Sequence, residues 1–480
     1  MGNNSIIEKD IENFHRLERS KDLDLLLERI GDSHFVLLGE ASHGTSEFYR
    51  WRTEITKRLI NEKGFSFIAV EGDWPDCYKV NRYIKGFPDS GKNAYDVLNS
   101  FNRWPTWMWA NKEMKELVEW LKLYNDKQQE QKQKNNSITS NSNGKIVGFY
   151  GLDLYSLWES MEAIIQYLKK VDPNAIKDAI EAYNCFEPYK KDVGNYARAT
   201  AFVPENCEDE VIEMLTSLRN KIDVYSKKDH GNREEDYFNA EQNAITAKDA
   251  ELYYRTMIKG DVNSWNIRDT HMIETLERLI AFHGKGNSKA IIWAHNTHIG
   301  DARATDMSKD NTINLGQLVR ERKNSHNTVL VGFGTYNGSV ITSKRWGDKM
   351  EQMKVPPAIY GSWDHILHSL KNDSTITSSH TNDKLIIFSH DHDYDEDDSN
   401  KILIKNDNRS NKINNSKYKG QRAIGVVYNP QYEKYGNYVP TILHLRYDAF
   451  LFIDETHALH PLHIPTIDDK DFPETFPTGV

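Results

Sequence analysis

Phe35-Val-Leu-Leu-Gly-Glu-Ala-Ser-His-Gly-Thr-Ser-Glu-Phe-Tyr-Arg-Trp-Arg52 is the stretch of this 480-residue chain that decides its fold. Its first four apolar residues predict a buried strand that ends at Gly39, and residues 48–60 predict a helix. The turn between them carries Glu40 and His43. In open α/β sheets such a turn lies at the carboxyl end of the strand, where ligands bind. An imidazole and a carboxylate on one short turn suit proton transfer, although capping of the helix by neighbouring hydroxyl side chains is a structural alternative.

Composition narrows the class of protein. The chain has 38% hydrophobic residues, 11 Trp and 24 Tyr, which is enough for a sizeable core. A net charge of −10 argues against a nucleic-acid partner. No apolar run reaches the roughly 18 residues of a membrane helix, and the N-terminus lacks a signal-peptide core. Three cysteines in no zinc-binding spacing leave at least one unpaired. We expect a cytoplasmic protein without a nucleic-acid or membrane partner, and the sequence leaves its oligomeric state open.

Three more apolar runs predict strands that also end in polar residues. These runs are Phe65–Val70, Lys145–Asp153 and Lys289–Ala294. With the first turn, their ends supply Glu40 with His43, Glu71, Asp153 with Tyr155, and His295 with His298. Since the carboxyl ends of parallel strands meet at one edge of a sheet, we expect these side chains to converge. Later strands are expected at Thr328–Gly334, Lys384–Phe388, Arg422–Tyr428 and Leu451–Asp454.

The remaining pattern predicts an α/β fold with a largely parallel central sheet flanked by helices. An amphipathic helix is expected from Ile7 to Arg29, and residues 156–282 are helical in pattern throughout. Tracts poor in apolar residues cannot offset their ordering entropy and predict mobile polar insertions. The predicted parts are a discontinuous α/β core of residues 1–155 and 283–465, a helical insertion of residues 156–282, mobile polar insertions at 126–143 and 389–420, and a C-terminal tail at 466–480.

The polar strand ends allow three kinds of site. Histidines among carboxylates, without a Gly-x-Ser-x-Gly elbow, indicate a general base that activates water. His295 and His298, together with His43 and a glutamate, could instead hold zinc or manganese. A purely structural polar network is the third interpretation.

An aromatic cluster adds a possible pocket wall. Phe101-Asn-Arg-Trp-Pro-Thr-Trp-Met-Trp109 places Trp107 and Trp109 beside the start of a helix. Such a cluster can line a pocket for a bulky apolar ligand, or it can pack in the core. A non-enzymatic protein that binds a hydrophobic ligand or haem therefore stays open as an alternative.

Several motifs in a fixed order carry a family resemblance. They are Gly39-Glu-Ala-Ser-His-Gly44, Val70-Glu-Gly-Asp-Trp74, Pro105-Thr-Trp-Met-Trp109, Arg268-Asp269 with Met272, Trp293–Ala302, Asn314–Leu318, Val355–Ala358 and Arg422–Pro430. Over roughly residues 20 to 460 the chain resembles the erythromycin esterase family, some of whose relatives carry a succinoglycan-biosynthesis label. The resemblance implies a parallel-centred α/β fold in which a helical part closes a deep cleft.

The resemblance also implies residue roles. His43 is similar to the general base of the family, and Glu40 and Glu71 match the acidic residues that orient and polarise it. Arg52 and His295 match basic groups suited to stabilising an oxyanion. Six further candidates are expected to bind substrate. They are His298, Arg268, Trp107, Trp109, Asp153 and Tyr155.

We therefore expect a hydrolase that cleaves a small-molecule carboxylic ester, similar to a macrolide lactone, without a metal or other cofactor. Inactivation of an antibiotic is the role that the resemblance implies. A zinc- or manganese-dependent hydrolase of an acylated carbohydrate is the alternative enzyme. The two polar tracts at 126–143 and 389–420 are not features associated with the antibiotic-inactivating members.

Overall fold

The computed structural model describes residues 14–135, 145–189, 193–202, 206–221, 233–258, 262–284, 286, 288–370, 382–388 and 418–463. The predicted tail at 466–480 and nearly all of the polar insertion predicted at 389–420 lie outside these residues. Among the described helices, none is both long and apolar enough to cross a bilayer.

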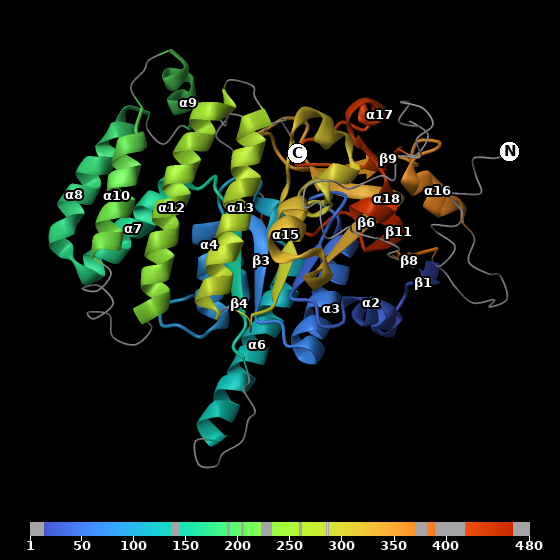
Figure 1. The fold of residues 1–480 in the computed structure, drawn as a ribbon, viewed down its shortest axis with the longest axis horizontal. Helices are drawn as coiled ribbons and strands as arrows, with labels where there is room; N and C mark the ends of the chain where they lie inside the picture. The colour runs from blue at the N-terminus through green and yellow to red at the C-terminus, as the bar shows by residue number, and fades with distance from the viewer. Residues whose placement is uncertain are drawn as a thin grey trace.

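The described residues form a nine-stranded, mostly parallel sheet at the centre of the molecule (Figure 1). Its order is β1-β8-β11-β6-β2-β5-β3-β4, and β7 pairs with β6. The strands are β1 (Phe14–Arg16), β2 (Phe35–Leu38), β3 (Phe67–Asp73), β4 (Gly148–Asp153), β5 (Ala290–Trp293), β6 (Thr328–Thr342), β7 (Glu351–Val355), β8 (Lys384–Ile387) and β11 (Ala449–Thr456). Neighbours from β11 to β4 pair in parallel, whereas β1, β7 and β8 pair antiparallel. The predicted α/β fold is confirmed.

Helices cover both faces of the sheet, so β2 and β5 are apolar at every position. Val36 and Leu38 point into one core with α2, α3 and α6. Phe35 and Leu37 point into the opposite core with α13, α15 and α16. The covering helices are α2 (Asp24–Ile30), α3 (Ser46–Lys63), α4 (Trp74–Ile84), α5 (Ala94–Leu98), α6 (Lys112–Asn135), α13 (Val262–Phe282), α15 (Leu315–Lys323) and α16 (Trp363–Ser369).

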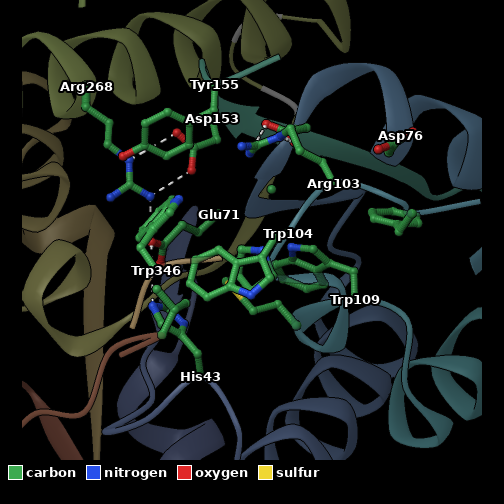
Figure 2. A pocket seen from close by; sticks show the side chains of 16 residues that line it. His43, Glu71, Asp76, Arg103, Trp104, Trp109, Asp153, Tyr155, Arg268 and Trp346 are labelled. Carbon is green, nitrogen blue, oxygen red and sulfur yellow. Dashed lines mark hydrogen bonds and ion pairs between the residues drawn. The ribbon is translucent and has the colours of Figure 1, made fainter. Parts of the chain in front are cut away.

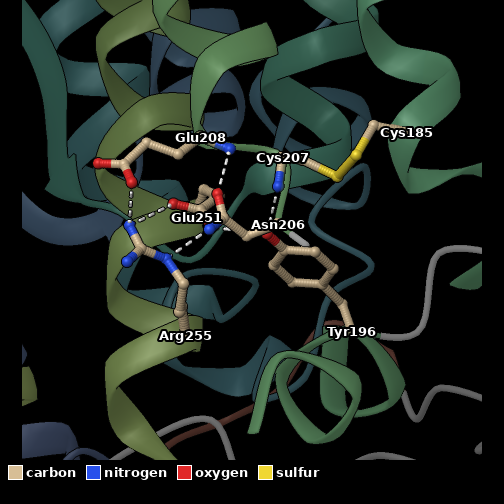
Figure 3. The surroundings of a disulfide bond; sticks show 7 residues. All are labelled: Cys185, Tyr196, Asn206, Cys207, Glu208, Glu251 and Arg255. Carbon is tan, nitrogen blue, oxygen red and sulfur yellow. Dashed lines mark hydrogen bonds and ion pairs between the residues drawn. A yellow bond between two sulfur atoms is a disulfide. The ribbon is translucent and has the colours of Figure 1, made fainter. Parts of the chain in front are cut away.

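The helical insertion has an apolar core of its own, built from residues between Leu154 and Met257. Its helices are α7 (Leu157–Val171), α8 (Ile176–Tyr183), α9 (Val193–Phe202), α10 (Glu208–Asn220) and α12 (Arg233–Met257). A disulfide joins Cys185 to Cys207 (Figure 3). Cys77, in α4, is free and buried. Because Met272 and Leu276 of α13 pack on the sheet, α13 belongs to the covering layer of the α/β core. Ile267 of the same helix packs against the core of the insertion, so α13 contacts both parts.

Three local predictions are wrong. The tract from Asp126 to Asn135 continues α6, because Gln, Lys and Glu propagate an already formed helix well. Gln129 also anchors this extension through a 2.9 Å bond to the carbonyl of Lys85. Residues 14–16 form β1 and pair with β8 instead of continuing a helix. The third error concerns the predicted strand at 422–428.

That predicted strand is broken: its start belongs to a two-stranded sheet, and Ile424 and Val427 make only isolated bridges, to Ser42 and Ser343. β9 (Lys419–Arg422) pairs with β10 (Tyr438–Thr441) in a separate two-stranded sheet. The residues that follow lie against the β2–α3 loop instead, where Ile424 N donates to Ala41 O at 2.8 Å. The short helices α17 (Glu433–Gly436) and α18 (Leu443–Arg446) complete this part of the chain.

A segment after β11, residues 457–462, runs along the β2–α3 loop, and we call it the strap. Its carbonyl at His457 accepts from Ser46 N at 2.8 Å, and its Leu459 N donates to Gly44 O at 3.0 Å. Gly44 also lies so close to Ile341 that a Cβ would overlap the β6 backbone. The strap therefore fixes the loop that carries His43.

Candidate active site

The loop between β2 and α3 presents His43 to a cleft and buries Glu40 behind it. Glu40 Oε1 lies 2.9 Å from His43 Nδ1, and its Oε2 accepts from Arg52 Nη2 at 2.6 Å. A carboxylate can only accept, so His43 Nδ1 carries the proton. Gly39 allows the close approach to α14 (Asn296–Ile299), since a Cβ there would clash with the Asn296 side chain. Nε2 of His43 is thereby left as the basic atom.

Electrostatics favour a basic His43. Its side chain is almost fully buried, and Nε2 lies 4.0 Å from Glu71 Oε1. Burial lowers the pKa of His43, but the carboxylates of Glu71 and Glu40 outweigh burial and raise the pKa above 6.5. Arg268 opposes this rise. The imidazole can therefore accept a proton more readily than a free histidine.

Glu71, at the end of β3, is the centre of the polar network. Its Oε2 accepts from the backbone N of His295 at 2.7 Å, and its Oε1 accepts from Arg268 Nη2 at 2.7 Å. Asp153, from β4, binds the same guanidinium at 2.7 and 3.0 Å. Burial raises the pKa of Glu71, yet the Arg268 guanidinium and the backbone N–H of His295 hold it well below its usual range. Glu71 is thus an anion at any pH at which His43 can act.

Behind Arg268 lies a second histidine–carboxylate pair. His298 Nδ1 is 3.0 Å from both carboxylate oxygens of Asp269, and its Nε2 is 2.9 Å from Arg268 Nη1. The His298 ring stacks on Trp265 with 4.5 Å between ring centroids. Both the plane and the tautomer of His298 are therefore fixed by neighbours.

His295 lies beside His43, with 4.9 Å between the ring centroids. Its Nδ1 accepts from Thr297 N at 3.3 Å, which leaves the ring proton on Nε2. That atom is buried and has no hydrogen-bond partner among the described residues. Burial and the nearby His43 lower the pKa of His295 well below 6.5. His295 is hence a neutral donor next to the base.

The cleft opens beside His43 (Figure 2). Its enclosed cavity has a volume of about 60 Å³, and space open to solvent brings the total to about 610 Å³. One wall is apolar, and the opposite side carries charges. The apolar lining is Phe101, Trp104, Pro105, Met108, Trp109, Trp346 and Val426; the polar lining is His43, Glu71, Asp73, Asp76, Arg103, Asp153, Tyr155 and Arg268. Arg103 pairs with Asp73 at 2.6 and 3.0 Å. Burial raises the pKa of Asp73 to about 6, although Arg103 opposes it.

The structure divides the residues proposed from the sequence into two groups. Those that line the cleft are His43, Glu71, Trp109, Asp153, Tyr155 and Arg268. Those that lie behind the lining are Glu40, Arg52, His295, His298 and Trp107. Arg52 is fully buried between the rings of Tyr49 and Trp293, and Trp107 packs edge-on against Trp104.

Sequence reasoning missed several members of the site. Asp73 lies in the motif Val70–Trp74 and Arg103 in the aromatic cluster Phe101–Trp109. Their opposite charges, close to a strand end, could have predicted an ion pair at the site. Asp269 stood beside Arg268 in the same way. Trp346 follows β6 and has no local signal, because only the fold brings it to Trp104, 4.4 Å between ring centroids.

Within the described ranges, no three His, Cys, Asp or Glu side chains come together in a group that could hold a metal ion. His295 and His298 lie on one short helical turn, yet each ring is already engaged by its own neighbours.

Comparison with known families matches residues 60–456 to the family described as Erythromycin esterase. The chain belongs to the erythromycin esterase family. Among its relatives is "Putative hydrolase YbfO" of Bacillus subtilis (strain 168), 25% identical over 356 residues, which are 68% of this chain and 70% of that protein.

Solved structures share the fold of this erythromycin esterase family member. A succinoglycan biosynthesis protein has a TM-score of 0.66 and 19% identity, over 96% of this chain and 98% of its own. A mutant of the erythromycin esterase EreC, in its open conformation, has a TM-score of 0.58 and 14% identity, over 92% and 95%. At these identities the likeness shows the α/β fold alone.

Proposed function

We propose that this protein is a hydrolase that cleaves a carboxylic ester of the macrolide-lactone type by attack of water. The observation that carries the proposal is the Glu40–His43 pair, which leaves a basic Nε2 beside an aromatic-walled cleft. Membership of the erythromycin esterase family and a relative named as a hydrolase support the class of reaction.

In the proposed reaction, His43 Nε2 takes a proton from water as the oxygen bonds to the ester carbonyl carbon. Glu40 holds the imidazole in the required tautomer and stabilises the imidazolium that forms. Arg52, which donates to Glu40 and lies outside the cleft lining, keeps that carboxylate in place. The tetrahedral intermediate then collapses, and His43 returns the proton to the leaving alkoxide. The products are an acid and an alcohol.

Arg268 and His295 are the proposed donors to the oxyanion. Arg268 lines the cleft, and among the described residues its Nη1 bonds only His298, so a second N–H stays free. The Nε2–H of His295 lies next to His43, behind the present cleft lining, and is proposed as a second donor to an ester carbonyl bound deep beside His43. Donors placed where negative charge develops lower the barrier most.

The aromatic wall supports a bulky, largely apolar ester as substrate. We further propose a cytoplasmic enzyme that needs no metal and acts on a small molecule, without a nucleic-acid or membrane partner. Elemental analysis of the purified protein tests the metal: stoichiometric zinc or manganese with loss of activity on chelation would favour the metal-dependent alternative. An absorbance scan with a Soret band would favour a haem-binding protein.

Mass spectrometry of erythromycin incubated with the wild-type protein and with His43→Ala tests the proposal. We expect the wild type alone to add one water to the antibiotic, while circular dichroism shows both proteins folded. Hydrolysis by the folded variant would overturn the role of His43. If neither protein acts, macrolide cleavage is wrong, and a library of acylated sugars and simple esters identifies the ester class.

A further inference from the structure

Two consecutive residues of α13 face different partners. Arg268 extends into the cleft, where it binds Glu71 and Asp153 (Figure 2). Asp269 points away from the cleft and is fully buried. Its Oδ1 accepts from Leu315 N, the first residue of α15, at 2.7 Å. Both of its carboxylate oxygens also lie 3.0 Å from His298 Nδ1. Asp269 is therefore anchored by a helix terminus and aimed at one imidazole nitrogen.

This contact selects one tautomer of His298. The Asp269 carboxylate can only accept, so Nδ1 carries a proton. Nε2 faces Arg268 Nη1 at 2.9 Å, and a guanidinium can only donate. Nε2 is hence an acceptor, and His298 is neutral with its proton on Nδ1. In the other tautomer an N–H would oppose the N–H of Arg268, and the nearest acceptor would be Glu71 Oε1, 3.4 Å away.

The tautomer of His298 decides which side chain donates a hydrogen bond to Glu71 Oε1. With Nε2 as acceptor, Arg268 is held by His298, Asp153 and Glu71 together, and its positive charge lies next to the Glu71 carboxylate. With Nε2–H, the imidazole and the guanidinium would compete for the same oxygen of Glu71. That oxygen is also the one 4.0 Å from His43 Nε2.

We propose that Asp269 is a positioning residue, which acts through His298 to hold the Arg268 guanidinium against Glu71 and thereby sets the charge balance around His43. This inference rests on the proposed function only for the role of His43 as the base. The chain of hydrogen bonds from Asp269 through His298 and Arg268 to Glu71, which we call the relay, can be tested without a substrate.

The charges that face His43 make the direction of the effect definite. Glu40 from its own loop and Glu71 from β3 raise the pKa of His43, whereas Arg268 from α13 lowers it. His295, ahead of α14, is neutral and lies against the same ring. If Arg268 moves away from Glu71, its positive charge offsets the Glu71 and Glu40 carboxylates less. The pKa of His43 then rises further.

Asp269→Asn tests the relay by a change of one atom. The amide can donate to His298 Nδ1, so we expect the proton of His298 to move to Nε2 and Arg268 to lose Glu71. In ¹⁵N-histidine NMR titrations, with His43 assigned by the loss of its signals in His43→Gln, the pKa of His43 should rise by about one unit. The acid limb of the hydrolysis profile should shift upward by the same amount.

Asp249→Asn is the matched control. Asp249 lies 2.7 Å from Nδ1 of His271, a buried histidine on the same helix α13 that does not line the cleft. The Asp249→Asn variant breaks the same kind of carboxylate–imidazole hydrogen bond, and we expect the pKa of His43 to stay unchanged in it. An equal shift in both variants would overturn the inference, because it would reflect general loosening of α13.

The wild-type protein gives a test that needs no stable variant. At pH 7 the ¹⁵N shifts of His298 should show a protonated Nδ1 and an unprotonated Nε2. The opposite tautomer, or an imidazolium, overturns the inference. If the tautomer and the Asp269→Asn shift are observed but no ester is cleaved, the relay stands and the proposed function fails.

Discussion

Two buried networks, one in the α/β core and one in the helical insertion, are built alike and face different surroundings. Each centres on a buried glutamate that binds an arginine: Glu71 with Arg268, and Glu251 with Arg255. In the insertion, Tyr196 also donates to Glu251 at 2.6 Å and accepts from the backbone N of Cys207 at 3.0 Å (Figure 3).

The difference lies in what each network touches. The Glu251 network ends on the backbone beside a disulfide and borders no part of the cleft lining. The Glu71 network opens onto a cavity and borders His43, whose Nε2 lies 4.0 Å from Glu71 Oε1 and has no closer carboxylate among the described residues. Burial and charge are therefore common to both networks and do not by themselves single out a candidate active site. The Glu71 network differs in that it lies beside a cavity and a histidine nitrogen that can still accept a proton.

Glu71→Gln should produce the largest effect. The substitution removes the Glu71 carboxylate, which binds Arg268 and holds the pKa of His43 high. The pKa of His43 should therefore fall, and we expect the hydrolysis rate to fall by at least about 100-fold. Breaking a buried ion pair should also cost about 3–5 kcal/mol of unfolding free energy. Steady-state kinetics and urea unfolding measure the two effects. A variant with wild-type kinetics would remove Glu71 from the mechanism.

Glu251→Gln makes the matched change in the insertion. Arg255 loses the Glu251 carboxylate, and Glu208, the first residue of α10, is then its remaining ion-pair partner among the described residues. We expect a loss of about 3 kcal/mol in unfolding free energy and no more than a twofold change in kcat/KM. A large fall in kcat/KM with little loss of stability would erase the contrast between the two networks.

Replacing both Cys185 and Cys207 by Ser should destabilise the insertion by about 3 kcal/mol, since the bond closes a loop of 22 residues in the unfolded chain. Hydrolysis at 25 °C should be unchanged. Thermal unfolding of the variant and the oxidised wild type, with kinetics on the same samples, separates stability from activity. Loss of activity without loss of stability would tie the insertion to catalysis.

The smallest effect concerns pH. Since the protonated imidazole cannot accept a proton, activity should rise with pH through the pKa of His43, which lies above 6.5. The stability linked to the same group has the opposite sign. A pKa raised by folding stabilises the protein fully below 6.5, and this contribution is lost as pH rises through the folded pKa. A pH–rate profile with its acid limb below 6.5 would contradict the electrostatics of the site.

The sequence predicted the parts of the fold whose signal is local. Apolar runs such as Phe35–Leu38 are buried on both faces and have no other stable place than a covered parallel sheet. The strand ends that follow from them, Glu71 and Asp153 among them, therefore lie together as expected. The helical character of residues 156–282 was equally local.

The rest depends on contacts between distant parts of the chain. Residues 14–16 become a strand only because β8 offers an edge, and Asp126–Asn135 stays helical because α6 already exists. Arg52 matched a cleft residue by motif, yet its side chain lies between two rings behind Glu40, a placement that no pattern in α3 encodes. Trp346 joins the cleft for the same kind of reason.

The strap has a consequence for the order in which the enzyme is made. His43 leaves the ribosome early, but Gly44 and Ser46 receive their partners Leu459 and His457 more than 400 residues later. The β2–α3 loop therefore cannot take its final hydrogen bonds until the strap has been synthesised, even if the first strands have already paired. A nascent chain carries His43 long before it carries the backbone that fixes the loop around it.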